Sequence, residues 1–317
     1  MPRTVLVTGG SGFIGSFTCR RLAEAGFNVV IYDKAAPSHP ALRGVQERIT
    51  YVKGDLLDWH LLVSALRNSG AEYVVHLAAP LSDETEANPY TALRGGVEAT
   101  LNVFEASYMQ GVGRVVWASS LAVYGSCTEC YPSQPLDESV APHPDTVYGA
   151  TKLYLEHLSK IYRERRNLSI IALRFGVVTG PLRTRGPTAL ASLIVEEAAR
   201  TGKIRVPVDP TVKIDWIYVL DAAEAILKAI TADKPRLHAY NIVSTRIELN
   251  DIIEALKETH PHLEITIPPN PVKPPLAAPS QGFSTTNAKK DLGWTPQWNL
   301  KNAVRNHIEW LSLLSTT

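Results

Sequence analysis

The chain has 317 residues, and its 32 basic and 31 acidic side chains leave a formal net charge of +1. A chain of this length can bury a sizeable core, either as one large α/β domain or as a large domain with a smaller partner. The near-neutral charge and the lack of a basic run argue against nucleic acid or an anionic membrane as a partner. No apolar run approaches membrane-spanning length and no leader precedes the first strand, so we expect a cytoplasmic protein.

A glycine-rich turn follows the first predicted strand. The β-branched run at 5–8 breaks into Gly-x-x-Gly-x-x-Gly, and a helix is predicted over 14–25. Gly9 permits the turn, Gly12 lets backbone amides come close to a phosphate, and Gly15 lets the helix pack against the strand. The pattern predicts a dinucleotide phosphate site at the N-terminus of this helix.

The second predicted strand, 29–33, indicates which dinucleotide binds. It ends in Asp33, and a carboxylate at that place accepts hydrogen bonds from the adenosine ribose and repels a 2′-phosphate. Lys34 stands directly beside it and could soften that repulsion. We expect NAD, with NADP as the alternative.

Strands and helices continue to alternate along the chain. A strand predicted over 49–56 places Asp55 at the same edge of the sheet as Asp33, where the adenine of a ligand would lie. A further strand, 73–79, ends in small residues that let a flat cofactor pass close to the backbone. We interpret His76 in this strand as a packed histidine.

Three side chains suited to proton transfer come next, namely Ser120, Tyr148 and Lys152. The strand predicted over 114–120 ends in Ser119 and Ser120, whereas Tyr148 and Lys152 are four residues apart and therefore share one face of a helix. A phenol with a pKa of about 10 becomes a usable acid or base only if a cation lowers that pKa, and Lys152 supplies the charge. Ser120 would hold the substrate oxygen that exchanges the proton.

In this order the motifs resemble those of extended short-chain dehydrogenases/reductases of the NAD-dependent epimerase/dehydratase family. The matching stretches are Thr8 to Gly15, Gly54 to Leu56, His76 to Ala79, Ser119-Ser120, Tyr148-x-x-x-Lys152, Leu173 to Phe175 and Asp291 to Pro296. The resemblance implies hydride transfer between C4 of nicotinamide and a carbinol carbon, with Tyr148 as acid/base and Lys152 also binding the nicotinamide ribose. The NAD contacts it implies are Gly9, Gly12, Phe13, Ile14, Gly15, Asp33, Asp55, Leu56, Leu77, Ala78, Ala79, Ser119, Tyr148 and Lys152.

The same resemblance implies an α/β Rossmann fold, a doubly wound parallel sheet with a smaller, discontinuous substrate domain. We place the NAD-binding domain in residues 1–175, with part of 203–245 rejoining its sheet, and most of the substrate domain in 176–317. A homodimer through two long helices, 88–110 and 148–165, is also implied. Gly95-Gly96 inside the first of these helices predicts a kink or close packing.

Several positions depart from the nucleotide-sugar members of the family. Val177 replaces an amide that binds diphosphate there, and Ile214 replaces an arginine that holds phosphate. A third arginine would fall near Pro274. Each charge-assisted contact to phosphate contributes about 1.5 to 3 kcal/mol, so the loss of three argues against a nucleoside diphosphate. Leu121 and Ala122 stand where dehydratases place acids, which disfavours elimination.

We therefore expect an NAD-dependent oxidoreductase that takes a hydride from a secondary alcohol of a small sugar acid, polyol or hydroxy acid. The stretch 205–216 resembles the branch of the family that oxidises such substrates. Candidate substrate contacts are Ser120, Tyr124, Arg183, Arg185 and Lys213. The basic ones could bind a carboxylate, although solvated loop arginines are the simpler interpretation. A UDP-glucose type 4-epimerase with tightly bound NAD is the alternative, and an NAD-sensing binding protein is a third.

The three cysteines are few and odd in number. Cys127 and Cys130 form a C-x-x-C, a pattern that occurs in redox-active pairs and in halves of metal sites. Without a second pair or a histidine at ligand spacing, we expect no metal site and a reduced surface loop.

Overall fold

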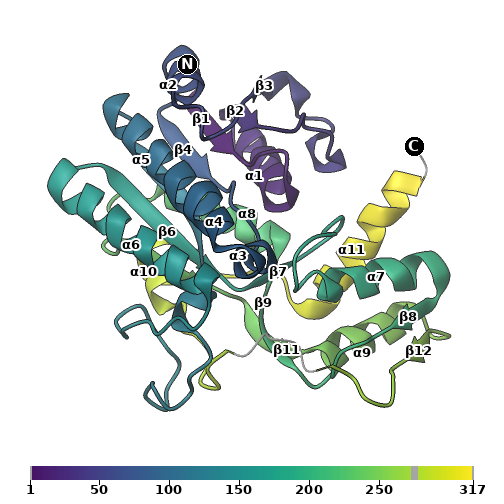
Figure 1. Ribbon diagram of the computed structural model, residues 1–317. Helices are drawn as coiled ribbons and strands as arrows, with labels where there is room; N and C mark the ends of the chain where they lie inside the picture. Colours follow the sequence, from purple (N-terminus) through teal and green to yellow (C-terminus); the bar gives the residue numbers. More distant parts are fainter. Residues whose placement is uncertain (1, 273–277, 316–317) are drawn as a thin grey trace.

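A seven-stranded parallel sheet forms the centre of the computed structural model, which describes residues 2–272 and 278–315 (Figure 1). Its strands run in the order β10-β6-β5-β4-β1-β2-β3. Their bounds are β1 (Thr4–Thr8), β2 (Asn28–Asp33), β3 (Ile49–Lys53), β4 (Tyr73–His76), β5 (Arg114–Ser120), β6 (Ser169–Phe175) and β10 (Ala239–Ile242). The direction of winding reverses between β1 and β4, which is where dinucleotides bind in such sheets. The predicted doubly wound α/β fold is confirmed.

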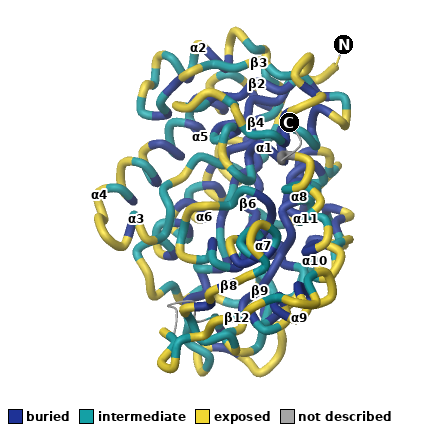
Figure 2. The backbone as a smooth tube through the Cα atoms, turned by 90° about the vertical axis from the view of Figure 1, so that its right-hand side faces the viewer, coloured by how far each residue is buried: buried dark blue, intermediate teal, exposed yellow. Residues whose placement is uncertain are grey.

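Helices cover both faces of this sheet (Figure 1). One face carries α2 (Trp59–Ser69), α5 (Ala99–Met109) and α6 (Val147–Arg166), and the other carries α1 (Phe13–Glu24) and α8 (Val219–Thr231). Successive strand residues point to opposite faces, so Leu6 packs with the first group of helices, and Val5 and Val7 pack with the second. Figure 2 shows the resulting core as buried backbone along the strands.

The chain beyond β6 builds a smaller lobe, seen at the lower right of Figure 1. Strands β7, β9 and β11 form one sheet, and β8 pairs with β12. The bounds of these elements are β7 (Val177–Thr179), β8 (Lys203–Arg205), β9 (Lys213–Tyr218), β11 (Thr245–Glu248), β12 (Glu264–Thr266), α7 (Leu190–Thr201), α9 (Leu249–Thr259) and α11 (Leu300–Ser315). By contrast, α10 (Thr286–Leu292) packs against β10 and α8 of the main body. Because β10 lies beside β6, the chain returns from this lobe to the main sheet.

The helix predicted over 88–110 changes its winding. It begins as α4 (Pro89–Thr91), continues as a π-helical segment (Ala92–Glu98) and ends as α5. Gly95 and Gly96 lie in the π-helical segment, and a Cβ on Gly96 would come within 3.3 Å of Thr151 Cγ2 on α6. The disturbance and the close packing predicted from this glycine pair are confirmed.

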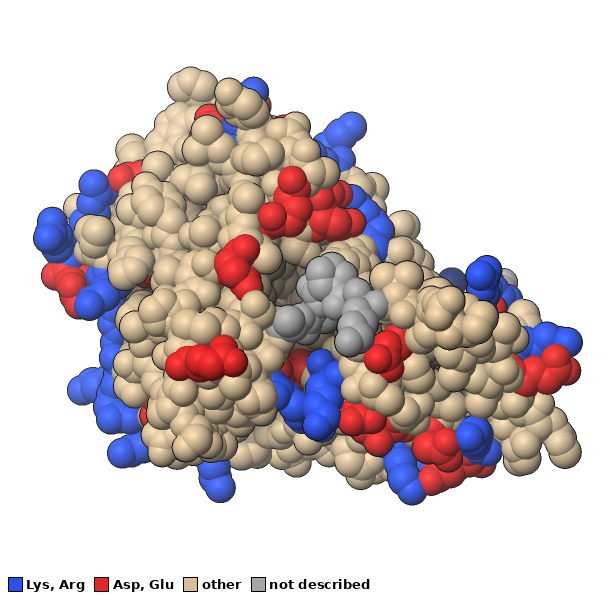
Figure 3. Space-filling model, turned by 60° about the horizontal axis from the view of Figure 1, so that its bottom comes forward, with Lys and Arg blue, Asp and Glu red and all other residues tan. Residues whose placement is uncertain are grey.

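Among the described helices, none is both long and apolar enough to cross a membrane. On the face shown in Figure 3, basic and acidic side chains are scattered among uncharged residues.

A buried ion pair joins α6 to β6. Arg174 Nη2 lies 2.6 Å from Glu156 Oε2, and the two side chains are 4% and 1% exposed. Ser119 Oγ, on β5, donates to Glu156 Oε1 at 2.6 Å, and Arg174 Nη1 donates to the Tyr124 hydroxyl at 2.6 Å. Glu156 raises the pKa of Arg174 above its ordinary value, against the effect of burial. Three neighbouring elements are therefore held in one register by charged and polar groups in the core.

Glu156→Gln should lower the free energy of unfolding by about 3 to 5 kcal/mol, because it leaves the Arg174 charge buried without its counter-ion. Urea unfolding followed by circular dichroism measures the change. Glu164→Gln on the same helix is the matched control, since its side chain is 59% exposed and lies 3.9 Å from Lys160. Equal stability of the two variants would contradict the role given to the buried pair.

Candidate active site

The glycine turn has the close contacts that its pattern predicts. Gly9 has φ +71°, and a Cβ there would lie 2.5 Å from the backbone nitrogen of Ala78. A Cβ on Gly15 would lie 2.0 Å from the Gly9 carbonyl oxygen, so α1 can pack here only without a side chain. Phe13 and Ile14 open α1, whose first N–H groups have no partner within the helix. This tight turn with the N–H groups of the first turn of α1 forms a cradle that fits a dinucleotide phosphate.

Asp33 lies beside that turn. Its carboxylate accepts the N–H of Ser11 and the N–H of Ala35, both at 3.1 Å. The two amides fix an acceptor next to the phosphate cradle, where the ribose of a dinucleotide would be held. Ser11 also donates its hydroxyl to the carbonyl oxygen of Ala35 at 2.7 Å, which fastens the loop after β2 to the turn.

Lys34 is paired with a neighbouring acid. Its Nζ lies 2.9 Å from Asp55 Oδ2, and both side chains are exposed. Burial alone would raise the pKa of Asp55, but the N–H of Leu57 and the Lys34 charge hold it below its usual value. The cation that could soften repulsion of a 2′-phosphate therefore has a counter-ion within the chain. Leu56, the other residue expected here, is buried next to Asp55 and accepts Asn102 Nδ2 through its carbonyl oxygen at 2.9 Å.

The strand end at 76–79 lies against the glycine turn. The N–H of Leu77 donates to the carbonyl oxygen of Thr8 at 3.0 Å, and Ala78 is the residue that a side chain on Gly9 would meet. His76 is 3% exposed, with Nδ1 2.7 Å from Thr8 Oγ1 and Nε2 2.9 Å from Thr100 Oγ1. Burial lowers its pKa to about 3. The interpretation of His76 as a packed, neutral histidine is confirmed.

Tyr148 and Ser120 come together as predicted. Tyr148 sits in the first turn of α6, whose N-cap Thr146 accepts the N–H of Gly149 at 3.0 Å. Burial raises the pKa of Tyr148, while a side-chain hydrogen bond with Ser120 and the positive charge of Arg183 oppose that rise. Ser120 closes β5 and accepts the N–H of Ala122 at 3.1 Å. A phenol and a hydroxyl that share one hydrogen bond can hold and deprotonate a substrate alcohol.

Lys152 lies close to the Tyr148 ring. Its ammonium donates to the carbonyl oxygen of Ala118 at 2.8 Å and lies 5.5 Å from the centroid of the Tyr148 ring. Burial lowers its pKa to about 8, although Glu156 opposes the change. The cation thus faces the ring of the tyrosine, while the groups that lower the pKa of the phenol itself are Ser120 and Arg183.

The three basic candidates for a substrate carboxylate differ in their surroundings. Arg183 is half-buried, binds the carbonyl oxygen of Val178 and the hydroxyl of Thr188, and lies close enough to Tyr148 to affect its pKa. Burial lowers the pKa of Arg183 to about 10. Arg185 is 74% exposed and pairs with Glu84. The interpretation of both arginines as solvated loop residues is therefore wrong for Arg183.

The other candidates are less well placed to meet a ligand. Lys213 is exposed at the start of β9. Tyr124 is 0% exposed, and its hydroxyl donates to Asn241 Oδ1 at 3.0 Å and accepts from Arg174. The expectation that Tyr124 contacts the substrate is therefore wrong, because its hydroxyl is already hydrogen-bonded inside the protein. The Ser119 hydroxyl is likewise engaged, with Glu156.

Two features of the structure were not predicted from the sequence. Leu182 adopts φ +66°, a conformation that costs a branched residue energy, directly before Arg183. Its N–H donates to Glu196 Oε1 at 2.7 Å, which helps to hold the turn. Arg246 on β11 forms a two-point ion pair with Asp215 on β9, at 3.0 and 2.6 Å. No local pattern marks either feature.

The C-x-x-C expectation is also corrected. Cys127 and Cys130 are joined by a disulfide with an S–S distance of 2.02 Å, instead of lying in a reduced loop. Across the described residues, no group of three or more histidines, cysteines or acids is arranged to hold a metal ion. The position near Pro274 expected for a third phosphate anchor lies outside the described residues.

Comparisons with known proteins identify the family of this chain. The model of the NAD dependent epimerase/dehydratase family matches residues 5–242. The mitochondrial L-threonine 3-dehydrogenase of Bos taurus is 26% identical, over 95% of this chain and 80% of that protein. A UDP-glucose 4-epimerase of Corynebacterium glutamicum is 28% identical, over 92% and 91% of the two chains. The UDP-glucose 4-epimerase of Thermus thermophilus in complex with NAD has a TM-score of 0.83 and 25% identity, covering 96% of this chain and 98% of that one. The chain belongs to the NAD-dependent epimerase/dehydratase family and is an NAD-dependent enzyme of the extended short-chain dehydrogenase/reductase type.

Proposed function

We propose that the enzyme oxidises a secondary alcohol of a small anionic substrate, a sugar acid or a hydroxy acid, with NAD. The observation that carries this proposal is Arg183, a half-buried cation whose charge lowers the pKa of Tyr148. The positions that hold phosphate in nucleotide-sugar relatives support it, because Val177 is apolar and Ile214 is 4% exposed and packed in the core. A neutral polyol would leave the Arg183 charge without a counter-ion.

Each polar group has one task in this reaction. NAD, when bound, accepts the hydride at C4 of its nicotinamide. Ser120 holds the substrate oxygen, and Tyr148 takes the proton from it. Arg183 binds the carboxylate and thereby points the carbinol carbon at the cofactor. Lys152 would bind the nicotinamide ribose, and its ammonium lies over the Tyr148 ring. Residues 1–175 supply the cofactor site, and the part beyond 176 supplies most of the substrate side.

A nucleotide-sugar 4-epimerase is the second candidate, because a relative of that kind is as similar to this chain as the dehydrogenase is. The two functions differ in their net redox balance. The proposed enzyme should accumulate NADH steadily when given aldonates, uronates or hydroxy acids, read at 340 nm. Interconversion of UDP-glucose and UDP-galactose without net NADH, read by chromatography, would contradict the proposal and favour the epimerase.

Arg183→Gln should reduce kcat/KM for the acid substrate by about 10- to 150-fold, since a hydrogen bond to a charged group contributes about 1.5 to 3 kcal/mol. It should also move the pH profile. Arg183 lowers the pKa of Tyr148, so its removal raises that pKa, and the rise of kcat/KM with pH should shift to higher pH.

Steady-state kinetics from pH 6 to 10 measures both effects. Arg183→Lys, which keeps the charge, should restore part of each. Arg185→Gln is the matched control, because that side chain is exposed and pairs with Glu84. Equal losses in the two glutamine variants, or an unshifted profile in Arg183→Gln, would contradict the role given to Arg183.

We also propose a homodimer through the two long helices. Large apolar side chains are exposed on α4, the π-helical segment, α5 and α6, a face that a second copy would cover. They are Tyr90, Leu93, Tyr108, Met109, Tyr154 and Ile161. Light scattering should give twice the chain mass of 34.7 kDa, and Tyr154→Glu should shift it toward the monomer. A monomeric wild-type protein at micromolar concentration would contradict the proposal.

That the protein resides in the cytoplasm stays a prediction.

A further inference from the structure

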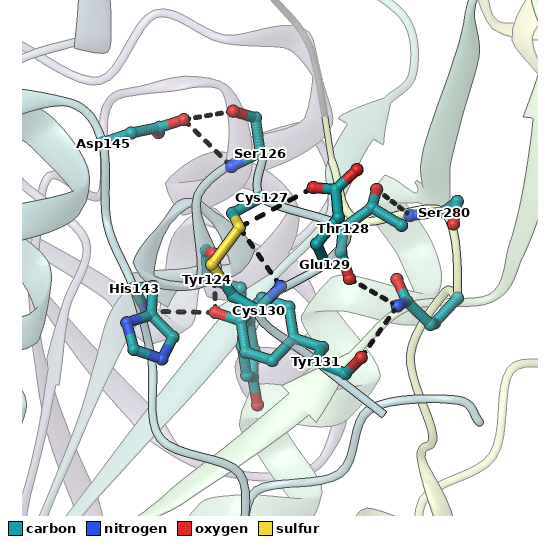
Figure 4. Close-up of a disulfide and its surroundings, with 11 residues drawn as sticks. Tyr124, Ser126, Cys127, Thr128, Glu129, Cys130, Tyr131, His143, Asp145 and Ser280 are labelled. Carbon is teal, nitrogen blue, oxygen red and sulfur yellow. Dashed lines mark hydrogen bonds between the residues drawn. A yellow bond between two sulfur atoms is a disulfide. The ribbon is translucent and has the colours of Figure 1, made fainter. Parts of the chain in front are cut away.

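The Cys127–Cys130 disulfide lies outside the proposed chemistry, in the loop between Ser120 and α6 (Figure 4). Cys130 is exposed and Cys127 is half-buried, so an incoming thiolate can reach one of the two sulfurs. The remaining cysteine, Cys19, is buried, and burial raises its thiol pKa far above the usual value. Only the C-x-x-C pair is therefore accessible to thiol chemistry in the folded protein.

The surroundings of the disulfide favour one direction of attack. The N–H of Cys130 donates to Cys127 Sγ at 3.2 Å, which stabilises negative charge on that sulfur as it leaves. The carboxylate of Glu129 lies 4.0 Å from the same sulfur and opposes that charge. Ser126, directly before the pair, is fixed because its N–H and hydroxyl both donate to Asp145.

The same loop holds a segment from the C-terminal part of the chain. Thr128, between the two cysteines, accepts Gln281 Nε2 on its carbonyl oxygen at 2.8 Å and the N–H of Ser280 on its hydroxyl at 3.2 Å. Arg246 donates to the carbonyl oxygens of Pro279 and Ser280, both at 2.8 Å, and is paired with Asp215. The disulfide therefore shapes the loop that fastens residues 279–281 over the Arg246–Asp215 pair.

The loop also contacts the buried network of Glu156 and Arg174. Tyr131, directly after Cys130, donates its hydroxyl to the carbonyl oxygen of Tyr124 at 2.7 Å and accepts the N–H of His143 at 3.0 Å (Figure 4). Tyr124 in turn binds Arg174 of the buried network. The loop is therefore in contact, through Tyr131 and Tyr124, with the buried network that joins α6 to β6.

We propose that Cys127 and Cys130 form a reversible thiol–disulfide exchange site whose partners are a dithiol reductant and a low-molecular-weight disulfide. In reduction, a thiolate of the dithiol attacks Cys130 Sγ, the Cys127–Cys130 bond breaks, and Cys127 leaves as a thiolate. The second thiol of the reductant then displaces Cys130 from the mixed disulfide, so that the protein gains two electrons and the reductant becomes a disulfide. A low-molecular-weight disulfide reverses both steps. Reduction opens the loop around Thr128 and loosens residues 279–281.

The test uses the full native chain in mixtures of reduced and oxidised dithiothreitol, followed by rapid alkylation with iodoacetamide and intact-mass spectrometry. We expect two alkyl groups to enter together, at Cys127 and Cys130 and not at Cys19, and oxidised glutathione to restore the unalkylated form. Glu129→Gln should speed reduction about two- to fivefold, because it removes the opposing charge. A disulfide that resists excess dithiothreitol until the protein unfolds would overturn the proposal, as would thiols that oxidised glutathione leaves free.

Hydrogen–deuterium exchange tests the coupling without any substrate, so it stands apart from the proposed dehydrogenase activity. Amides of 280–284 should exchange about three- to tenfold faster in the reduced protein, since the hydrogen bond from the Ser280 N–H to Thr128 weakens and the Gln281 side chain loses its contact with the same residue. Amides of β5 should not change. The Cys127→Ser/Cys130→Ser double variant should exchange like the reduced protein and should not respond to dithiothreitol. Equal exchange of 280–284 in the two redox states would overturn the link between the pair and this segment.

Discussion

The ion pair between Glu156 and Arg174 is the constraint on which the candidate site depends. Both charges are almost fully buried, so neither can lose its partner without a large desolvation penalty. The pair fixes α6 against β6, and Ser119 adds β5 to the same network. Because Tyr148 and Lys152 belong to α6 and Ser120 follows Ser119, the register of the network also sets the geometry of the proton-transfer groups.

In the proposed function, charge on the substrate side separates the two activities found among the relatives. A dehydrogenase and an epimerase in this family can share a cofactor cradle and a tyrosine–lysine helix, so those parts do not distinguish between them. In our proposal the distinction rests on the Arg183 charge, which lowers the pKa of Tyr148, and on the apolar residues at Val177 and Ile214. Asp215, which follows Ile214, is already paired with Arg246.

The sequence predicted those features that short-range sterics determine. Gly9 and Gly15 could be assigned because their neighbours in the turn leave no room for a Cβ, and the pairing of Tyr148 with Lys152 follows from helical periodicity. Gly96 was also interpretable, since a helical glycine pair predicts disturbed winding. The doubly wound parallel sheet followed from the alternation of strands and helices together with the family resemblance.

The features that were missed depend on contacts between distant parts of the chain or on backbone conformation. Burial of Tyr124 requires Asn241, which is 117 residues away. The position of Arg183 depends on the positive φ of Leu182, which the sequence does not reveal. Whether Cys127 and Cys130 are oxidised depends on the shape of their loop and on redox conditions, and the sequence pattern alone favoured the reduced form.

The central claim is that Arg183 binds a substrate carboxylate next to Tyr148. A double-mutant cycle tests it most directly, with kcat/KM measured for an acid substrate and for its uncharged carboxamide, in the wild-type enzyme and in Arg183→Gln. The account predicts that the wild type prefers the acid by about tenfold or more, and that this preference nearly disappears in the variant. An undiminished preference for the acid in Arg183→Gln would contradict the account.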